Sequence, residues 1–471
     1  MTTDFSEPPA DVDESSAGSW GELFSRTYLA SASVLAGGVA LYAINLYFTA
    51  ALMPSIVDDI GGAAYYAWVS TGFLMAAVIA SMLVSRIVGA WGASTAYLIG
   101  FGVFGLGTLA NLLSPTMELL VAGRIVQGFG GGLLAGLGYA VISAALPARL
   151  WTRATGLISA MWGVGTLVGP TLGGLFAELG AWRGAYGFLL LVAIVLAVLT
   201  RRALPHGGGS PDRTPLPVWS LVLLTLTAAA FSVSSTVPHG APLVAALIAG
   251  VLLLVAFLLV EMRGRTSVLP ARTYRRGSPL KWVYLTVAAL CAGVMTEAFI
   301  PLFGQKLAGL SPLLAGLVGA GISVGWVAVQ VFSVNFGDRA ARRAIRVAPA
   351  LLTVGLVAYG LLQANNASAV LVVAWAASLF VGGAGIGLAF PHLSVAALSS
   401  SDDPGEGAKA AAGLNTTELI ANTVASAIAG TLVSLGGTSH VDGARLMALG
   451  IAVLTALALI AAFRATAAPR H

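Results

Sequence analysis

Charged side chains are scarce in this chain. Only 9% of its 471 residues are Asp, Glu, Lys or Arg, against about 25% in ordinary soluble domains. Hydrophobic residues make up 58%, and the mean hydropathy is +0.90. This composition excludes a soluble globular protein and indicates a chain that crosses a membrane many times. The net charge of +5 is too small to suggest a nucleic-acid partner.

Cysteine and metal-binding patterns are also nearly missing. Cys291 is the only cysteine, which excludes a disulfide framework and a thiolate metal site. The histidines, His392 among them, are scattered and lack metal-ligand spacing. The chain has no GxxxxGK[ST] phosphate-binding loop, and its non-membrane segments are too short to bury a core of their own. We therefore expect no metal, no cofactor and no enzyme activity.

Long apolar runs dominate what is present. Each run is close to the ~20 residues that a helix needs to span a bilayer. The runs lie at about 27–52, 65–84, 93–114, 117–141, 152–177, 184–201, 218–237, 241–262, 282–304, 312–335, 345–363, 367–391, 408–434 and 443–463. They predict an all-α membrane protein with fourteen transmembrane helices, arranged as six, two and six.

The segments between the runs divide the chain into seven units. We expect a disordered cytoplasmic tail (1–26), an N-terminal six-helix bundle (27–203), a linker (204–217), an extra two-helix hairpin (218–262), a basic cytoplasmic segment (263–281), a C-terminal six-helix bundle (282–465) and a cytoplasmic tail (466–471). The N-terminal tail lacks the basic region of a secretory signal. Two six-helix units around a linker suggest an internal duplication, as in transporters whose halves rock against each other.

Basic residues are distributed unevenly among the loops. With the N-terminus inside, twenty Lys and Arg fall in segments expected on the cytoplasmic side, whereas only Arg183, Lys306 and Arg445 fall in outer loops. The positive-inside rule then places both termini in the cytoplasm, with an even number of crossings. We expect a multi-pass protein of the cytoplasmic membrane.

Two glycine-rich runs between Val121 and Gly174 carry the most unusual pattern. The first, AGRIVQGFGGGLLAG, contains Arg124 and Gln127, three residues apart on one helix face. An arginine in hydrocarbon costs roughly 2.5–3.5 kcal/mol, so we expect it to face the protein interior or a wet cavity. The second run, MWGVGTLVGPTLGGLF, offers a flat stripe for close helix approach and a proline that tends to bend the helix. Its candidate conformational residues are Gly163, Gly165, Gly169, Pro170, Gly173 and Gly174.

These motifs resemble those of a known family. GRIVQGFGGG resembles the fourth-helix motif RxxQGxGxx of the major facilitator superfamily, and the run ending at Gly174 resembles its fifth-helix antiporter motif, GxxxGPxxGG. The stretches VEMRGRTSVLPARTYRR, PLFGQKLAGLSPLLAG and GLNTTELIANTVASAIAG are similar to segments of its fourteen-helix drug:proton antiporter family. The resemblance implies the major facilitator fold and a secondary transporter, an exporter that exchanges substrate for protons.

The chain departs from that pattern at two places. Asn45 lies nine residues before Pro54, where the family usually shows an aspartate. Any proton or cation that this aspartate handles in the family must be handled elsewhere here, or not at all. The family's loop motif GxLxDRxGxR is eroded in the first half, whereas its second copy, NFGDRAARR, keeps Asp338 and Arg339. These two residues are candidates for a gating loop; the alternative is a simply solvated loop.

Two carboxylates fall deep inside predicted spans, Glu297 and Glu418. Because burial favours the neutral form of a carboxyl, such a group can exchange protons near neutral pH. We expect Glu297, Glu418, Arg124, Gln127 and Asn45 to form the proton-coupling and substrate region. For both glutamates the alternative is a structural hydrogen bond to a neighbouring helix, and Arg124 could mainly hold helices in register.

The combined patterns predict proton-coupled efflux of small hydrophobic or amphipathic molecules by alternating access. Protons and membrane lipid are the other expected partners, and we expect the protein to act as a monomer. The alternative left open is a lipid translocator, or a transporter-like scaffold, without stoichiometric proton exchange.

Overall fold

Apolar helices make up the structure. The computed structural model of the chain describes residues 19–205, 207, 215–238, 240–263, 267–275, 277–400 and 404–467. Within these residues, 12 helices are long and apolar enough to cross a membrane, and one bent helix pair raises the number to 13. The prediction of an all-helical membrane protein is confirmed. The predicted count of fourteen is not, because one apolar helix, Val218–Val233, is only 16 residues long.

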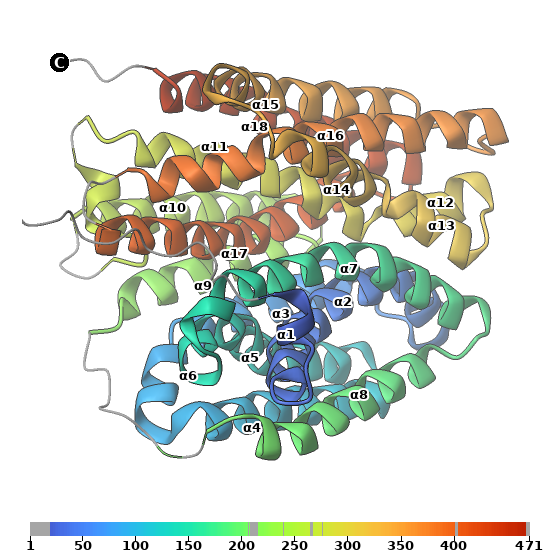
Figure 1. Cartoon of the computed structure of the whole chain (residues 1–471). Coiled ribbons are helices and arrows are strands. Elements are labelled where there is room, and N and C mark those ends of the chain that lie inside the picture. Colours follow the sequence, from blue (N-terminus) through green and yellow to red (C-terminus); the bar gives the residue numbers. More distant parts are fainter. Residues whose placement is uncertain are drawn as a thin grey trace, which may run out of the picture.

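The N-terminal half, blue to green in Figure 1, is a bundle of six long helices. They are α2 (Leu29–Ile60), α3 (Tyr66–Ser81), α4 (Val84–Leu112), α5 (Met117–Ala140), α7 (Trp151–Glu178) and α8 (Trp182–Ala203). The short elements are α1 (Trp20–Leu23), η2 (Ala63–Tyr65), α6 (Ile142–Ala145) and η3 (Ala148–Leu150). α2 packs mainly against α7, and α5 packs against α4 and α3.

The C-terminal half, yellow to red, contains two interrupted helices. In one, the turn η5 (Met295–Ala298) separates α11 (Leu280–Val294) from α12 (Ile300–Ala308). In the other, α13 (Pro312–Gly319) and α14 (Gly321–Ser333) meet at Ala320 with a bend of 43°. The remaining helices are α15 (Asp338–Leu361), α16 (Ala369–Leu398), α17 (Pro404–Leu435) and α18 (His440–Ala465).

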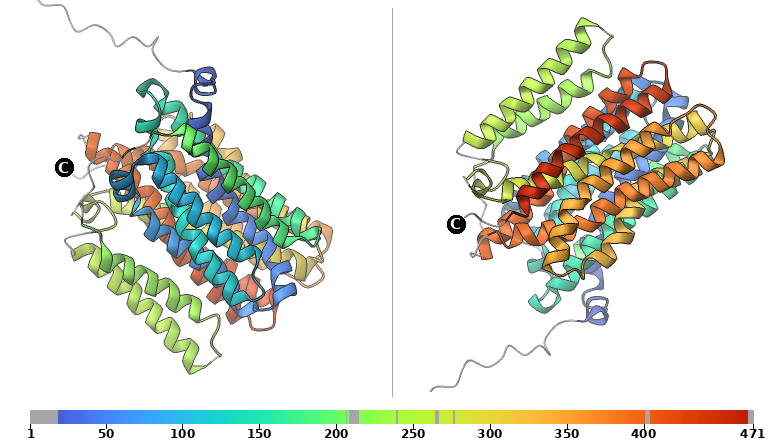
Figure 2. Two further views of the ribbon diagram at one scale, coloured as in Figure 1. Left: turned by 90° about the horizontal axis from the view of Figure 1, so that it is seen from below. Right: turned by 90° about the horizontal axis from the view of Figure 1, so that it is seen from above.

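A two-helix hairpin lies beside the two halves, as both views in Figure 2 show in light green. It consists of α9 (Val218–Val233) and α10 (Ala241–Arg263). α9 packs against α17 of the C-terminal half and α3 of the N-terminal half, and α10 packs against α9. The turn η4 (Ala271–Tyr274) then leads back to α11.

The bundle has two ends. We call the end where α2 begins and α18 finishes the proximal end, and the end where α2 finishes at Ile60 the distal end. Four helices that start at the distal end begin with a Ser or Thr cap, which satisfies a free backbone N–H group. The caps are Thr116 (α5), Ser311 (α13), Ser368 (α16) and Ser439 (α18).

Some predicted boundaries differ from the structure. Residues 1–18 and 468–471, in the predicted tails, and 206 and 208–214, in the predicted linker, lie outside the described residues. The described part of the N-terminal tail contains α1, whose Glu22 carboxylate lies 2.6 Å from Arg149. α4 begins about nine residues before its predicted apolar run, and Gly92, with φ of +80°, separates the two parts. Only glycine adopts that conformation readily, and the Gly207 carbonyl occupies the place of a Cβ at this position.

Candidate functional site

The two halves meet along α7 and α13 in direct backbone contact. A Cβ atom on Gly174 would lie 2.7 Å from the Leu313 Cα, and one on Gly316 would lie 2.8 Å from the Pro170 carbonyl oxygen. No side chain can be added at either glycine without moving the helices apart. This seam therefore closes more tightly than ordinary side-chain packing allows.

The predicted glycine stripe on α7 faces α2 of the same half. A Cβ on Gly165 would lie 2.5 Å from the Ala43 Cβ, and one on Gly173 would lie 2.5 Å from the Phe48 carbonyl oxygen. Gly169 faces the same helix, where an added Cβ would lie 2.9 Å from the Ile44 carbonyl oxygen. Gly163 is less tightly packed: an added Cβ would lie 3.5 Å from the Val327 side chain of α14. α7 thus packs one face against α2 of its own bundle and another face against α13 and α14 of the opposite half.

Glu297 is buried at the meeting point of both helix interruptions. It lies on η5, with 5% of its surface exposed. Ser323, in the first turn of α14, donates twice to it: the backbone N–H to Oε1 at 2.7 Å and the side-chain hydroxyl to Oε2 at 2.8 Å. The carboxylate therefore caps the start of α14, where unpaired N–H groups and the helix dipole favour a negative charge.

A water-sized void lies beside Glu297. Its volume is about 10 Å³, and its lining comes from both halves, so it matches the space of about one water molecule. The lining residues are Tyr47, Ala50, Pro170, Glu297, Pro301, Gly316 and Gly319. The glutamate and the glycine seam of α7 and α13 therefore border the same small space.

Two tyrosines of α2 lie among the charged groups. Tyr47 interacts electrostatically with both Glu297 and Glu418, and Tyr42 interacts with both Glu418 and Arg124. Glu418, on α17, is half-buried. α2 thus lies between the acids of the C-terminal half and the arginine of the N-terminal half.

Arg124 is fully buried inside the N-terminal half. Its Nη1 donates to the Gln127 Oε1 at 2.6 Å, and its Nε donates to the Val69 carbonyl at 3.2 Å. The guanidinium also lies 4.2 Å from the centre of the Phe73 ring. All these partners are neutral, so the predicted pairing with Gln127 exists but no described carboxylate forms an ion pair with this cation.

Gln127 connects Arg124 to α4. Its Oε1 also accepts from the Asn111 Nδ2 at 3.0 Å, and its Nε2 donates to the Thr108 hydroxyl at 2.8 Å. Asn45 on α2 is also fully buried, and neither polar atom of its amide has a hydrogen-bond partner among the described residues. The structure therefore joins Arg124 and Gln127 but leaves Asn45 outside their hydrogen-bond network.

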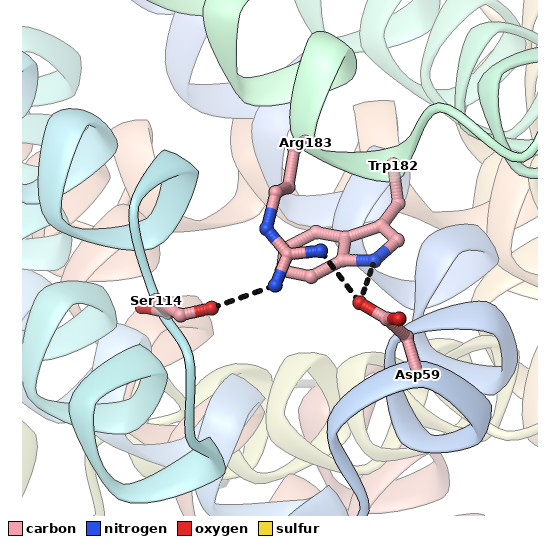
Figure 3. Close-up of polar contacts among 4 residues, drawn as sticks. All are labelled: Asp59, Ser114, Trp182 and Arg183. Atoms are coloured by element: carbon pink, nitrogen blue, oxygen red, sulfur yellow. Dashed lines mark hydrogen bonds and ion pairs between the residues drawn. The ribbon is translucent and has the colours of Figure 1, made fainter.

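Several hydrogen bonds and ion pairs lie at the distal end. Figure 3 shows the Asp59 carboxylate accepting from Trp182 at 3.1 Å and from Arg183 at 2.5 Å, while Arg183 also donates to the Ser114 carbonyl at 3.0 Å. These contacts stay within the N-terminal half and border an open cleft of about 440 Å³. The neighbouring Asp58 instead lies 3.4 Å from the Lys306 Nζ of the other half.

A second polar contact at this end also crosses between the halves. Glu178, at the end of α7, accepts from the Ser311 hydroxyl at 3.0 Å and from the Leu313 N–H at 3.3 Å. It therefore joins the serine in capping α13. Asp338 and Arg339, the gating-loop candidates, lie exposed on the first turn of α15, at the proximal end.

A family model described as Major Facilitator Superfamily matches residues 35–418. The chain belongs to this superfamily. The resemblance inferred from the motifs of α5 and α7 is thereby confirmed. Proteins of this superfamily are transporters, which agrees with the expectation that the chain is not an enzyme.

Relatives of this major facilitator protein include proteins whose descriptions mention drug efflux or antibiotic resistance. It is 43% identical over 461 residues to a protein of Mycobacterium tuberculosis described as a probable multidrug-efflux transporter, covering 96% of this chain and 97% of that protein. It is 26% identical to a methylenomycin A resistance protein of Streptomyces coelicolor, covering 92% of this chain and 93% of that protein.

Solved structures agree on the fold of this major facilitator protein. A crystal structure of a POT family transporter has a TM-score of 0.66 at 14% identity and covers 91% of this chain and 95% of its own. A D-xylose–proton symporter has a TM-score of 0.60, also at 14% identity. At this identity the likeness shows the arrangement of helices.

Sequence reasoning missed several residues that the structure places in the site. Ser323, Thr108 and Asn111 are uncharged polar residues among several in their apolar runs, and Tyr42 and Tyr47 look like ordinary packing residues. No spacing rule connects them to Glu297 or Arg124 along the sequence. Among the described residues, no group of three or more His, Cys, Asp or Glu side chains is placed to hold a metal ion.

Proposed function

We propose that this chain is a proton-coupled exporter of small hydrophobic or amphipathic molecules that works by alternating access. The observation that carries the proposal is Glu297: a buried carboxyl group inside a membrane-crossing helix, bordering a void lined by both halves. Ionisable groups at such depth are costly, and transporters use them in proton pathways. A carboxyl at this interface can couple its protonation to the relative position of the halves.

The substrate class follows from the relatives and from the interior. The 43% identical relative is described as a probable multidrug-efflux transporter, and a more distant one is described as a methylenomycin A resistance protein. The surfaces between the halves carry aromatic contacts, such as Tyr66 stacked on Phe299 with ring centres 5.0 Å apart. Aromatic surfaces with few fixed charges accept apolar molecules of varied shape.

The proposal includes fourteen crossings, with α9 as the fourteenth, and a monomer as the working unit. α9 and α10 form a hairpin of apolar helices, so α9 must cross if α10 does. An even number of crossings brings both termini to one side. The proximal end carries most of the basic residues, including Arg201, Arg202 and Arg339, so we place it in the cytoplasm.

With the distal end placed outside, the conformation described has its halves in contact at the outward end. Contacts of Lys306 with Asp58 and of Ser311 with Glu178 join the halves there. Where α3 of the N-terminal half packs against α17 of the C-terminal half, Thr71 donates to Ser426 at 3.3 Å. Release of substrate to the outside requires these contacts to break, and a proton bound from that side could reach Glu297 only after they have broken.

The test uses purified protein in liposomes that contain a pH-sensitive dye. Ethidium, rhodamine 6G and Hoechst 33342 are supplied with and without an imposed proton gradient. We expect substrate movement to carry protons in the opposite direction, and Glu297→Gln to stop gradient-driven accumulation while the protein still folds. Glu118→Gln, which alters an exposed carboxylate in the first turn of α5, is the control.

The same liposomes separate the alternative. Fluorescent phospholipid that crosses the bilayer without proton movement, and equally well in Glu297→Gln, would identify a lipid translocator. If Glu297→Gln still moves protons during substrate transport, the proton site would instead be Glu418, the other embedded carboxyl group.

A further inference from the structure

Two helix interruptions meet at one hydrogen-bonded pair. η5 interrupts the α11–α12 span, and Ala320 interrupts the α13–α14 pair. Glu297 belongs to the first interruption and Ser323 lies three residues beyond the second. Both are buried, with Ser323 fully so. The pair is thus the polar link between two interrupted helices of the same half.

Ser323 offers the carboxyl group two chemically different donors. The backbone N–H, 2.7 Å from Oε1, can only donate. The hydroxyl, 2.8 Å from Oε2, can donate to a carboxylate or, after rotation, accept from a protonated carboxyl. A buried acid that gains a proton needs an acceptor for it, since an unpaired buried polar group costs free energy. The hydroxyl supplies that acceptor at the oxygen where the proton would arrive.

We propose that Ser323 is the positioning residue for the proton at Glu297, an inference that rests on the function proposed above. Its hydroxyl donates when the glutamate is ionised and accepts when the glutamate is protonated. The backbone N–H keeps Oε1 at the start of α14 in both states. The proton is then exchanged at Oε2, without moving the carboxyl group from the junction of the two helix interruptions.

Other titratable groups near this pair come from four helices. They are Tyr47 of α2, Tyr66 of α3, Cys291 of α11 and Glu418 of α17. Tyr47 interacts electrostatically with Glu297, Cys291 and Glu418, and the Tyr66 hydroxyl donates to the carbonyl of Ala298, next to Glu297, at 3.2 Å. α12 carries Lys306, which lies at the distal end against Asp58. Only the two hydrogen bonds of Ser323 are direct polar contacts of the Glu297 carboxyl group among the described residues.

The experiment is a pH titration of the purified full chain followed by infrared difference spectroscopy, which needs no substrate. The C=O stretching band of protonated carboxyl groups is recorded in the wild type and in Ser323→Ala, Ser323→Thr and Glu297→Gln. Ser333→Ala is the matched control, because Ser333 is a buried serine of the same helix whose hydroxyl donates to the Gly387 carbonyl. Thermal unfolding in detergent checks that each variant is folded.

We expect Glu297→Gln to remove one titrating band. In Ser323→Ala this band should remain, move to higher frequency and titrate at higher pH, with proton affinity raised about fivefold to tenfold. The direction follows because a hydrogen bond to a charged group is worth more than one to a neutral group, so the ionised form loses more. Ser323→Thr and Ser333→Ala should titrate like the wild type.

The outcomes separate the two proposals. If Glu297→Gln removes no titrating band, Glu297 is not the proton site and the proposed function fails at that point. If it removes the band but Ser323→Ala titrates like the wild type, the role of Ser323 is overturned while the proposed function stands. Should Ser323→Ala not fold, Ser323→Cys replaces it, since a thiol is a weak partner, and an unchanged band would again overturn the inference.

Discussion

The network around Arg124 predicts an unusual order of mutational costs. Gln127→Leu should destabilise the protein more than Arg124→Met, although the second change removes a charge. The amide of Gln127 accepts at 2.6 Å from Arg124 and at 3.0 Å from Asn111. Without it, a buried cation and a buried amide donor both lose partners.

The size of each cost follows from what remains buried. An unpaired buried donor costs about 1–3 kcal/mol, and more when it is charged, so Gln127→Leu should lower the free energy of unfolding by about 4 kcal/mol. Arg124→Met removes the guanidinium together with its desolvation cost, and Gln127 keeps its bond to Asn111. Its cost should be mainly packing, about 1–2 kcal/mol.

The assay is unfolding in mixed micelles, titrated with dodecyl sulfate and followed by helical circular dichroism. Gln127→Glu serves as the control, because it keeps an acceptor for both neighbours and adds a counter-charge. Its free energy of unfolding should exceed that of Gln127→Leu by several kcal/mol. An Arg124→Met variant that loses as much stability as Gln127→Leu would refute the view that the cation is buried at a net cost.

Three further predictions concern other parts of the molecule. On α7, Gly173→Leu should sharply reduce the yield of folded protein in size-exclusion chromatography, whereas Gly163→Leu should be milder. A Cβ at position 173 would lie 2.5 Å from the Phe48 backbone, whereas one at position 163 would meet only the Val327 side chain at 3.5 Å. Equal yields would contradict this prediction. Burial and the hydrogen bond to Glu261 raise the pKa of Tyr274, so the stability from its neutral phenol is complete below the ordinary tyrosine pKa of about 10 and is lost as pH rises further. The backbone amides of η4 should therefore lose protection from hydrogen exchange at high pH in the wild type, and not in Tyr274→Phe. Thr431→Val removes the donor to the α9 backbone at 3.0 Å and should increase proteolytic cleavage between α9 and α10, which an unchanged cleavage rate would disprove.

Much of the fold could be predicted because the length and hydropathy of an apolar run identify a membrane helix. Every predicted run coincides with a helix or a pair of helices among the described residues. The predicted number of fourteen transmembrane helices was not confirmed at α9. This helix ends at Val233, whereas the apolar run continues to residue 237 as turns. Hydropathy measures how apolar a stretch is, and does not locate the residue at which the helix ends.

The candidate site was predicted only in part, and the reason is physical. An ion in an apolar run is costly, so Glu297 and Arg124 stood out, and helical spacing identified Gln127 as a partner of Arg124. Ser323 and Asn111 could not be found in this way, because each meets its partner through the packing of separate helices. Tertiary alignment of helices is not encoded in a local pattern.

The hairpin of α9 and α10 was inserted between the halves without entering either bundle. Since α9 makes the contacts with α3 and α17, α10 presents much of its surface outward, including Leu252 and Met262 at 62% and 63% exposure. Its environment is therefore set by the thickness and fluidity of the surrounding bilayer. A spectroscopic label on α10 would therefore report the lipid around the transporter without altering Glu297 or Arg124.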